Sequence, residues 1–179
     1  MPLFVSMLRG INVGGARPLK MERLKGIYRK LGLAGARSYL QSGNVVFRAK
    51  ARCAPQIERA IAGECGLEVS VVVLSAREMS AVVARNPLVG RPNIDPTFLH
   101  ATFLASRVPK GGLDREGLPL GPGEEAVILG KTVYLYCPNG YGNTKLNNAY
   151  FERTLASRAT TRNWRTVVAL ERMGRGGEP

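Results

Sequence analysis

The order of strand and helix signals in the first 75 residues is the feature that most limits how this chain can fold. Hydrophobic periodicity and turn residues predict six elements. They are a strand at 3–8, a helix at 20–33, short strands at 37–40 and 44–48, a helix from Pro55 onward and a strand at 68–74. This β-α-β-β-α-β order is that of the ferredoxin-like split unit, in which both helices cover one face of an antiparallel sheet. The first part of the chain is therefore expected to adopt that fold.

A second and looser copy of the same order is expected in the rest of the chain. Ser75 and Glu78 form a capping-box signal for a further helix, which Asn86-Pro87 ends. The expected elements beyond it are a strand at 98–105, a short helix or turn at 111–119, a hairpin of 126–129 and 132–137, a helix at about 145–155 and a last helix opened by 160–164. We therefore expect an α+β protein with two ferredoxin-like subdomains, the second degenerate, both with antiparallel sheets.

Turn-rich composition sets the expected boundaries between these parts. Proline and glycine are concentrated between residues 87 and 97, which marks a linker. The predicted organisation is an N-terminal subdomain at 1–86, the linker at 87–97, a second α+β subdomain at 98–173 and a flexible tail at 174–179.

Positive charge is concentrated toward both ends of the sequence. The whole chain of 179 residues has a formal net charge of +13. Residues 1–56 hold eleven Lys and Arg against one acid, residues 57–144 hold eight against nine, and residues 145–175 hold seven against two. This distribution predicts one positive face built from both ends of the chain, which would attract nucleic acid or other polyanions. The alternative is compositional drift, since nineteen of the twenty-six bases are arginine.

Composition also excludes several classes of protein. No apolar run approaches the ~20 residues that cross a bilayer, and Arg9 interrupts the N-terminal run before it could serve as a secretory signal. The expected location is therefore the cytoplasm, with no membrane partner. Three cysteines without a Cys-x-x-Cys pair and a single histidine, His100, favour neither a disulfide framework nor a zinc site. No cofactor or metal is predicted.

The segment Leu8–Gly15 is the first candidate binding site. It follows a predicted strand and precedes a basic helix, an order that directs backbone N–H groups toward an anion. Gly10 and Gly15 have the spacing of a phosphate-binding P-loop, but Ala16 and Arg17 stand where Lys and Ser/Thr would bind phosphate and magnesium. Nucleotide hydrolysis of that type is therefore excluded. An anion site using Arg9, Asn12, Gly14 and Gly15 stays open, against the alternative that the glycines only turn the chain and Asn12 caps backbone groups.

Two later segments are candidates for the same site. Lys145 is expected in the first turn of its helix, where a cation is unfavourable unless an anion lies nearby; the alternative is a solvated lysine. At the start of the last helix, Arg162 and Asn163 are expected to be exposed contacts, whereas Trp164 is assigned to the core. His100 is interpreted as a packed histidine, because no acid or nucleophile can be paired with it from the sequence.

These residues favour binding over catalysis. No Ser-His-Asp, Cys-His or carboxylate pair is evident from the spacing, so catalytic residues stay unassigned. The leading hypothesis is a basic binding protein for nucleic acid or a phosphorylated small ligand. One alternative is an enzyme acting on a small anionic metabolite through oxyanion-type stabilisation. Another is a scaffold that binds a protein partner.

The motifs together resemble a bacterial family of proteins, domain-of-unknown-function family 1697. The resemblance is carried by Leu8–Gly15, Tyr39–Phe47, Asn86-Pro87, Gly142–Leu146 and Ala159–Trp164. The family typically has Arg followed by Ser or Thr where this chain has Asn143-Thr144. The resemblance implies a two-part α+β protein with ferredoxin-like subdomains. It implies no activity and no catalytic residue.

Overall fold

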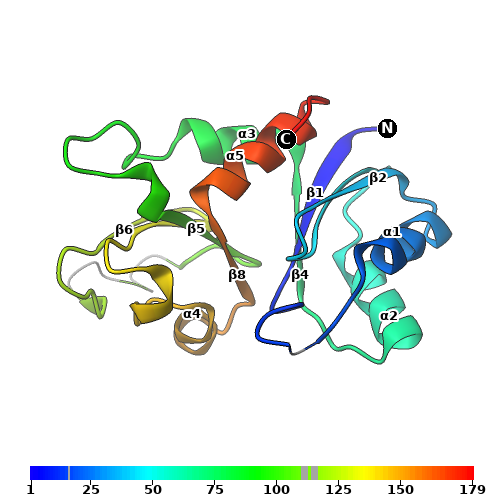
Figure 1. Cartoon of the computed structure of the whole chain (residues 1–179), viewed down its shortest axis with the longest axis horizontal. Coiled ribbons are helices and arrows are strands. Elements are labelled where there is room, and N and C mark those ends of the chain that lie inside the picture. Colours follow the sequence, from blue (N-terminus) through cyan, green and yellow to red (C-terminus); the bar gives the residue numbers. More distant parts are fainter. Residues whose placement is uncertain (16, 110–112, 114–116) are drawn as a thin grey trace. The chain divides into compact units, whose positions relative to one another are not determined.

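The computed structural model describes residues 1–15, 17–109, 113 and 117–179. The chain forms two compact units. Unit 1 comprises Met1–Ala81 and Val168–Pro179, and unit 2 comprises Val82–Val167. Each unit contains a four-stranded antiparallel sheet (Figure 1). Among the described residues, no helix combines the length and the apolar character that crossing a membrane requires.

Unit 1 has the ferredoxin-like topology that the sequence predicts. Its elements are β1 (Leu3–Leu8), α1 (Met21–Lys30), β2 (Ala34–Tyr39), β3 (Asn44–Arg48), α2 (Ala54–Cys65) and β4 (Val71–Ser75). The sheet order is β2-β3-β1-β4, with every neighbouring pair antiparallel. Central β1 pairs on both sides, since Val5 lies opposite Val46 of β3 and Leu74 of β4. Helices α1 and α2 lie together on one face of this sheet (Figure 1).

The helical face of the sheet encloses the core of unit 1. The apolar stripe of α1 buries Leu24, Ile27 and Tyr28, and α2 buries Ile57 and Ile61. These side chains pack in one cluster with alternate residues of the strands. Helix α1 ends at Lys30, before the predicted Leu33, because Leu31 is 36% exposed and Gly32 turns the chain at a φ of +71°.

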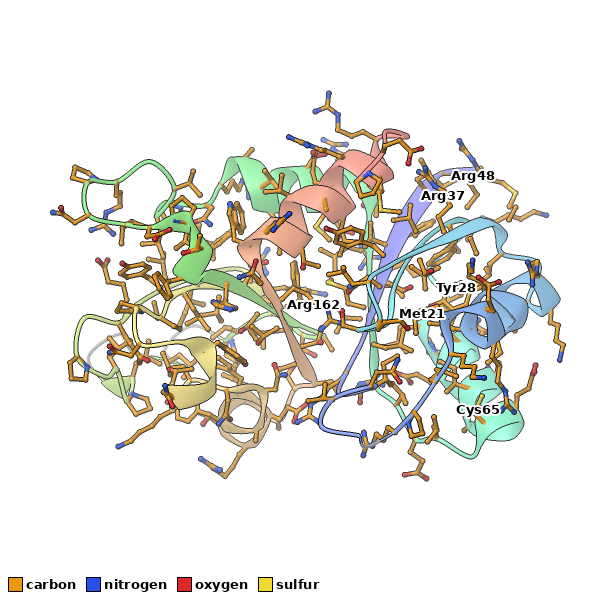
Figure 2. The ribbon with its side chains drawn as sticks, in the orientation of Figure 1. Met21, Tyr28, Arg37, Arg48, Cys65 and Arg162 are labelled. Carbon is orange, nitrogen blue, oxygen red and sulfur yellow. The ribbon has the colours of Figure 1, made fainter. Side chains whose placement is uncertain are left out.

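A buried hydroxyl pair lies inside this core. The Tyr28 hydroxyl, on the inner side of α1 (Figure 2), shares a 2.7 Å hydrogen bond with Ser6 Oγ of β1. Ser6 Oγ also donates to the carbonyl oxygen of Val45 on β3. Burial raises the pKa of Tyr28 far above its usual value, although the hydrogen bond with Ser6 opposes the rise. The pair is therefore neutral and contributes to structure, because a buried polar group is stable only when it is hydrogen-bonded.

The opposite face of the first sheet is also covered. Val5 and Met7 of β1 are fully buried, and a Cβ atom on Gly174 would lie 3.6 Å from Val5 and from Ala76. Gly174 ends α5 (Trp164–Gly174), and Ala76 begins α3 (Ala76–Ala84). The predicted capping box starts α3: Ser75 N–H donates to Glu78 Oε2 at 2.8 Å, and Glu78 N–H donates to Ser75 Oγ at 3.2 Å. The valine-rich β4 is thus sheltered on both faces, as its composition predicts.

Unit 2 repeats the same strand order around a different core. Its elements are β5 (Leu99–Leu104), β6 (Glu125–Leu129), β7 (Thr132–Tyr136), α4 (Asn148–Leu155) and β8 (Ala159–Asn163), and its sheet order is β6-β7-β5-β8. Helix α4 buries Phe151 against β5, β7 and β8. The predicted helix or turn at 111–119 falls largely outside the described residues.

The last strand corrects the sequence analysis. Residues 160–164 were expected to open the final helix, but 159–163 form β8 and the helix begins at Trp164. The β-branched Thr160 and Thr161 favour a strand, and their register with Phe103 and Thr102 of β5 supplies the sheet edge that unit 2 needs.

The two units divide the chain differently from the expected boundaries at 86 and 98. Unit 2 begins at Val82, inside α3, and the last twelve residues belong to unit 1. The tail 174–179, whose flexibility stays a prediction, makes polar contacts in unit 1: Gly177 N–H donates to the Arg172 carbonyl, and Arg37 donates to the carbonyls of Met173 and Gly177. A cation at the carboxyl end of a helix complements its exposed carbonyl groups.

Gly43 permits the closest backbone approach in unit 1 and generates a testable prediction. A Cβ atom there would lie 2.7 Å from Ile11 Cδ1 and 2.8 Å from Leu8 Cβ, and Gly43 has a φ of +75°. We expect Gly43→Ala to lower the free energy of unfolding by about 2 kcal/mol or more, from overpacking combined with backbone strain. Chemical denaturation measures the change.

Gly66 is the matched control for this prediction. It has a φ of +65°, and no atom lies within 4 Å of the position its Cβ would take. Gly66→Ala therefore carries the backbone strain alone, of the order of 1 kcal/mol. Equal losses in the two variants would show that the contact with Leu8 and Ile11 contributes nothing.

Candidate functional site

The loop between β1 and α1 has an unusual concentration of left-handed backbone. Its residues with positive φ are Gly10, Asn12, Gly14, Gly15 and Arg17. The nearby hairpin turn adds Leu40 at +56° and Gly43 at +75°. Non-glycine residues in this conformation carry strain, and such strain is concentrated at functional sites. Of the five non-glycine residues with positive φ in the described chain, Asn12, Arg17 and Leu40 lie in these two segments.

Asn12 holds the loop against the hairpin turn. Its Nδ2 donates to the carbonyl oxygens of Leu19 and Gln41 at 2.9 and 2.6 Å. Its Oδ1 accepts a 2.7 Å hydrogen bond from Leu19 N–H. Two further backbone bonds anchor the start of the loop, from Leu8 N–H to Gly43 and from Arg9 N–H to Ser70. The Asn12 amide thus caps backbone groups, the alternative role that the sequence left open, and it fixes the loop rather than presenting a free amide to a ligand.

Gly14 and Gly15 turn the chain at the tip of the loop. Both have positive φ, and Asn12 N–H donates to the Arg17 carbonyl at 3.2 Å. Both glycines are exposed, and no atom lies within 4 Å of the place that a Cβ would take on either of them. Their backbone is therefore open to solvent at the point where the sequence predicted contact with an anion.

Three cations accompany this loop. Arg9 is half-buried at its base, and Arg17 and Lys20 are exposed on its return to α1. Lys20 is the N-cap residue of α1 and makes no side-chain capping bond. Glu22, the acid in the first turn, pairs with Lys25 at 2.6 Å, and the hydrogen bond and charge of Lys25 lower the pKa of Glu22. The start of α1 thus combines a positive helix dipole with basic side chains.

In unit 2 the structure changes the position of Lys145. Helix α4 begins at Asn148, after the N-cap residue Asn147, whose Oδ1 accepts a bond from Tyr150 N–H at 3.0 Å. Lys145 is exposed and lies before the helix. The predicted placement in the first turn is wrong, because Asn147 caps α4 after a short 3-10 turn, η3 (Tyr141–Asn143). Lys145 therefore does not occupy a position where the helix dipole disfavours a cation.

Arg162 is not the exposed contact that the sequence predicted, whereas Asn163 is half-buried. Arg162, on β8 (Figure 2), is 9% exposed, and its Nη1 donates to Thr160 Oγ1 and the Thr161 carbonyl, both at 2.9 Å. Burial lowers its pKa to about 10, so it stays charged at neutral pH. Asn163 Oδ1 accepts from Arg165 N–H, which caps α5. The prediction that Trp164 is a core residue is confirmed, at 6% exposure.

His100 is packed in unit 2, as the sequence indicated. Its ring stacks on Tyr141 with centroids 4.9 Å apart, and its Nδ1 lies 3.1 Å from the Phe98 carbonyl oxygen. Burial lowers the pKa of His100, although the Phe98 carbonyl opposes the shift. The neutral imidazole therefore predominates at neutral pH. No cluster of three or more His, Cys, Asp or Glu suited to a metal ion occurs in the described part of the chain.

The predicted site residues fall into two groups. Arg9, Asn12, Gly14 and Gly15 belong to one loop of unit 1, whereas Lys145, Arg162 and Asn163 belong to unit 2. The convergence of all three segments on one pocket stays a prediction. Arg17 and Lys20 are not among the predicted ligands, although their position shortly after the glycine turn is a signal in the sequence.

The Asn12 bonds give the first testable prediction at this site. Asn12→Ala removes all three side-chain hydrogen bonds and places alanine at a φ of +54°, so we expect a loss of about 2–3 kcal/mol in unfolding free energy. Asn12→Asp keeps an acceptor for Leu19 N–H and tolerates this backbone, so its loss is expected to be smaller. Urea unfolding checks the order, and an alanine variant no less stable than the aspartate variant would contradict it.

His100 gives a pH-dependent prediction. Its pKa is lowered in the folded state, so the unfolded chain binds the proton more tightly and acid favours unfolding. The contribution of His100 to stability is full above its ordinary pKa of about 6.5 and is lost as pH falls through the lower folded value. We expect His100→Asn to reduce the change in unfolding free energy between about pH 7 and pH 5. Identical slopes in the variant and the unaltered protein would contradict the assignment.

Comparison with known proteins places the chain in a family. A search of curated proteins found no match. A solved structure, that of the conserved bacterial protein SP0830 from Streptococcus pneumoniae, matches with a TM-score of 0.67 and 24% identity, covering 97% of this chain and 98% of that one. This similarity shows a shared fold. The family described as "Protein of unknown function (DUF1697)" matches residues 1–134, so the chain belongs to the DUF1697 family.

Proposed function

We propose that this chain is a binding protein for a phosphate-bearing ligand, a nucleic acid or a phosphorylated small molecule, and that the loop from Arg9 to Lys20 is the contact site. A cytoplasmic location is part of the same proposal. The observation that carries it is the start of α1, which has no side-chain cap and directly follows the exposed cations Arg17 and Lys20. Uncapped N–H groups, a helix dipole and cationic side chains together favour a bound phosphate.

Preorganisation of the loop supports the proposal. The Asn12 amide joins the start of the loop to Leu19 at its end and to Gln41 of the hairpin turn, and Gly43 packs closely against Leu8 and Ile11. A fixed loop loses little conformational entropy on binding, so more of the interaction energy remains as affinity. The charge of unit 1 adds long-range attraction, because it holds fifteen Lys and Arg against seven acids.

The alternative of a protein-binding scaffold is favoured by one observation. Val13 and Leu40 are 64% and 55% exposed, and the Asn12–Gln41 hydrogen bond joins the segments that carry them. Exposed apolar side chains at neighbouring loop tips are typical of surfaces that bind another protein. The alternative of an enzyme acting on a small anionic metabolite would use the same N–H groups and cations to stabilise a developing negative charge.

A thermal-shift screen tests the proposed function. Its arms are inorganic phosphate, pyrophosphate, sugar phosphates, nucleotides and short oligonucleotides. A ligand present at about 100 times its Kd should raise the free energy of unfolding by about 2.7 kcal/mol. We expect the double variant Arg17→Asn/Lys20→Gln to lose that stabilisation, because it removes two cations from the loop, while Asn tolerates the left-handed backbone at position 17.

The matched control is the double variant Arg29→Gln/Arg59→Gln, which also removes two positive charges, one from α1 and one from α2. Both arginines are exposed. The proposal requires that this control keep the ligand-induced shift. No shift with any phosphate-bearing compound would overturn it, as would equal losses in the two double variants. Among positive results, the oligonucleotide and small-phosphate arms separate the two ligand classes.

A further inference from the structure

A second group of cations lies at the other end of the first sheet, away from the loop. Strand β1 begins here, and the register places Leu3 opposite Arg48 of β3. Arg48 Nη1 donates to the Met1 carbonyl at 3.1 Å, and Ala49 N–H donates to the Pro2 carbonyl at 3.2 Å. Lys50 follows directly and is exposed. This end of the sheet is thus basic along the edge where β3 leaves it.

Helices α3 and α5 bring further cations to the same end. Ser75, just before α3, lies opposite Phe4 near the start of β1, and the last residue of α5, Gly174, approaches Ala76. Arg77 of α3, next to Ala76, and Arg172 of α5, two residues before Gly174, are both exposed. Residues about 100 positions apart in the sequence therefore lie side by side in unit 1.

Two more arginines connect these elements. Arg37 of β2, shown with Arg48 in Figure 2, donates to the carbonyl oxygens of Met173 and Gly177 at 3.2 and 3.3 Å. Arg52 donates to Glu78 on α3. We call the whole group the terminal basic surface; it consists of Arg37, Arg48, Lys50, Arg52, Arg77, Arg172 and Arg175.

Three carboxylates lie within this surface, and each already has a cation. Arg52 pairs with Glu78, Arg175 with Glu171 at 3.7 Å, and Arg37 with Glu178 at 3.5 Å. Within the described part of the chain, Arg48, Lys50, Arg77 and Arg172 form no ion pair with a carboxylate. Four exposed positive charges at one end of a small unit produce a strong local field, which an anionic partner would reduce.

The composition of the surface indicates the chemistry of that partner. Six of its seven cations are arginine, whose planar guanidinium group donates paired hydrogen bonds to phosphate. Insertion into a membrane would need an apolar helical face beside the charges, but Leu170 and Met173 of α5 are buried in the protein. Burial of the sheet faces in unit 1, where Val5, Met7 and Val46 are fully enclosed, also excludes stacking of bases on that sheet.

We propose that the terminal basic surface is a second binding site, which contacts the phosphate backbone of duplex nucleic acid without reading its sequence. A group of cations on a surface without a base-reading element suits contacts with phosphates, which position a duplex but do not specify it. The site is separate from the loop at the start of α1, so it stands whether or not that loop binds a phosphate.

The test compares the unaltered protein with the double variant Arg77→Gln/Arg172→Gln. Binding to a fluorescein-labelled duplex DNA is measured by fluorescence anisotropy over a series of potassium chloride concentrations. Each lost phosphate contact lowers the slope of log affinity against log salt by about 0.9, so the double variant should lose about 1.8. At the lowest salt its affinity should fall by about tenfold or more. A duplex of scrambled sequence should bind equally well.

The matched control is Arg29→Gln/Arg59→Gln, which removes two arginines from the helical layer on the opposite face of the sheet. It should keep the slope within about 0.5 of the unaltered value. Lys50→Glu, a charge reversal in a separate turn, should weaken binding on its own, and thermal unfolding confirms that each variant is folded.

Four outcomes would overturn the proposal. They are no binding to the duplex at low salt, an unchanged slope in the Arg77/Arg172 variant, an equal loss in the control variant, and binding to phosphatidylserine vesicles without binding to DNA. Loss of small-phosphate binding in the Arg17/Lys20 variant bears only on the loop, so failure of the proposed function and failure of this proposal are distinguishable.

Discussion

The central strand β1 is the constraint on which the rest of unit 1 depends. It pairs with β3 on one side and β4 on the other, and both of its faces are buried. A strand enclosed in this way cannot slip by one residue, because the slip would exchange its two faces and displace Val5 and Leu8 from their neighbours. The register fixes where β1 ends, and with it the point at which the Gly10–Leu19 loop leaves the sheet.

The two ends of β1 carry different kinds of positive charge. At its carboxyl end, Asn12 and the contact of Gly43 with Leu8 and Ile11 hold a strained loop in place. At its amino end, the cations lie on separate elements that meet because α5 returns to unit 1. A single anchored loop suits a small, defined anion, whereas cations spread over several elements suit an extended polyanion. The two proposals follow from this difference in how the cations are distributed.

Particular residues show how far the sequence could predict the structure. The alternation of apolar residues correctly located Leu3–Leu8 and α1, because burial of one stripe or face is a local property of the pattern. Ser75 and Glu78 identified the start of α3 for the same reason, since a capping box is complete within four residues. The strand Ala159–Asn163 was missed, because its five residues gain stability from pairing with β5, about 60 positions earlier.

Some properties of the candidate site can likewise be predicted from the sequence, and others depend on the tertiary structure. By itself, the sequence determined the fold class, the membership of a family and the presence of a glycine-rich basic loop, since these depend on local pattern and composition. Only the tertiary structure decided that the Asn12 amide binds backbone groups, that Arg162 is buried beside Thr160, and that Gly174 of α5 lies against Ala76 of α3. The physical reason is that side-chain burial and charge proximity depend on contacts between residues far apart in the chain, which periodicity and spacing do not encode.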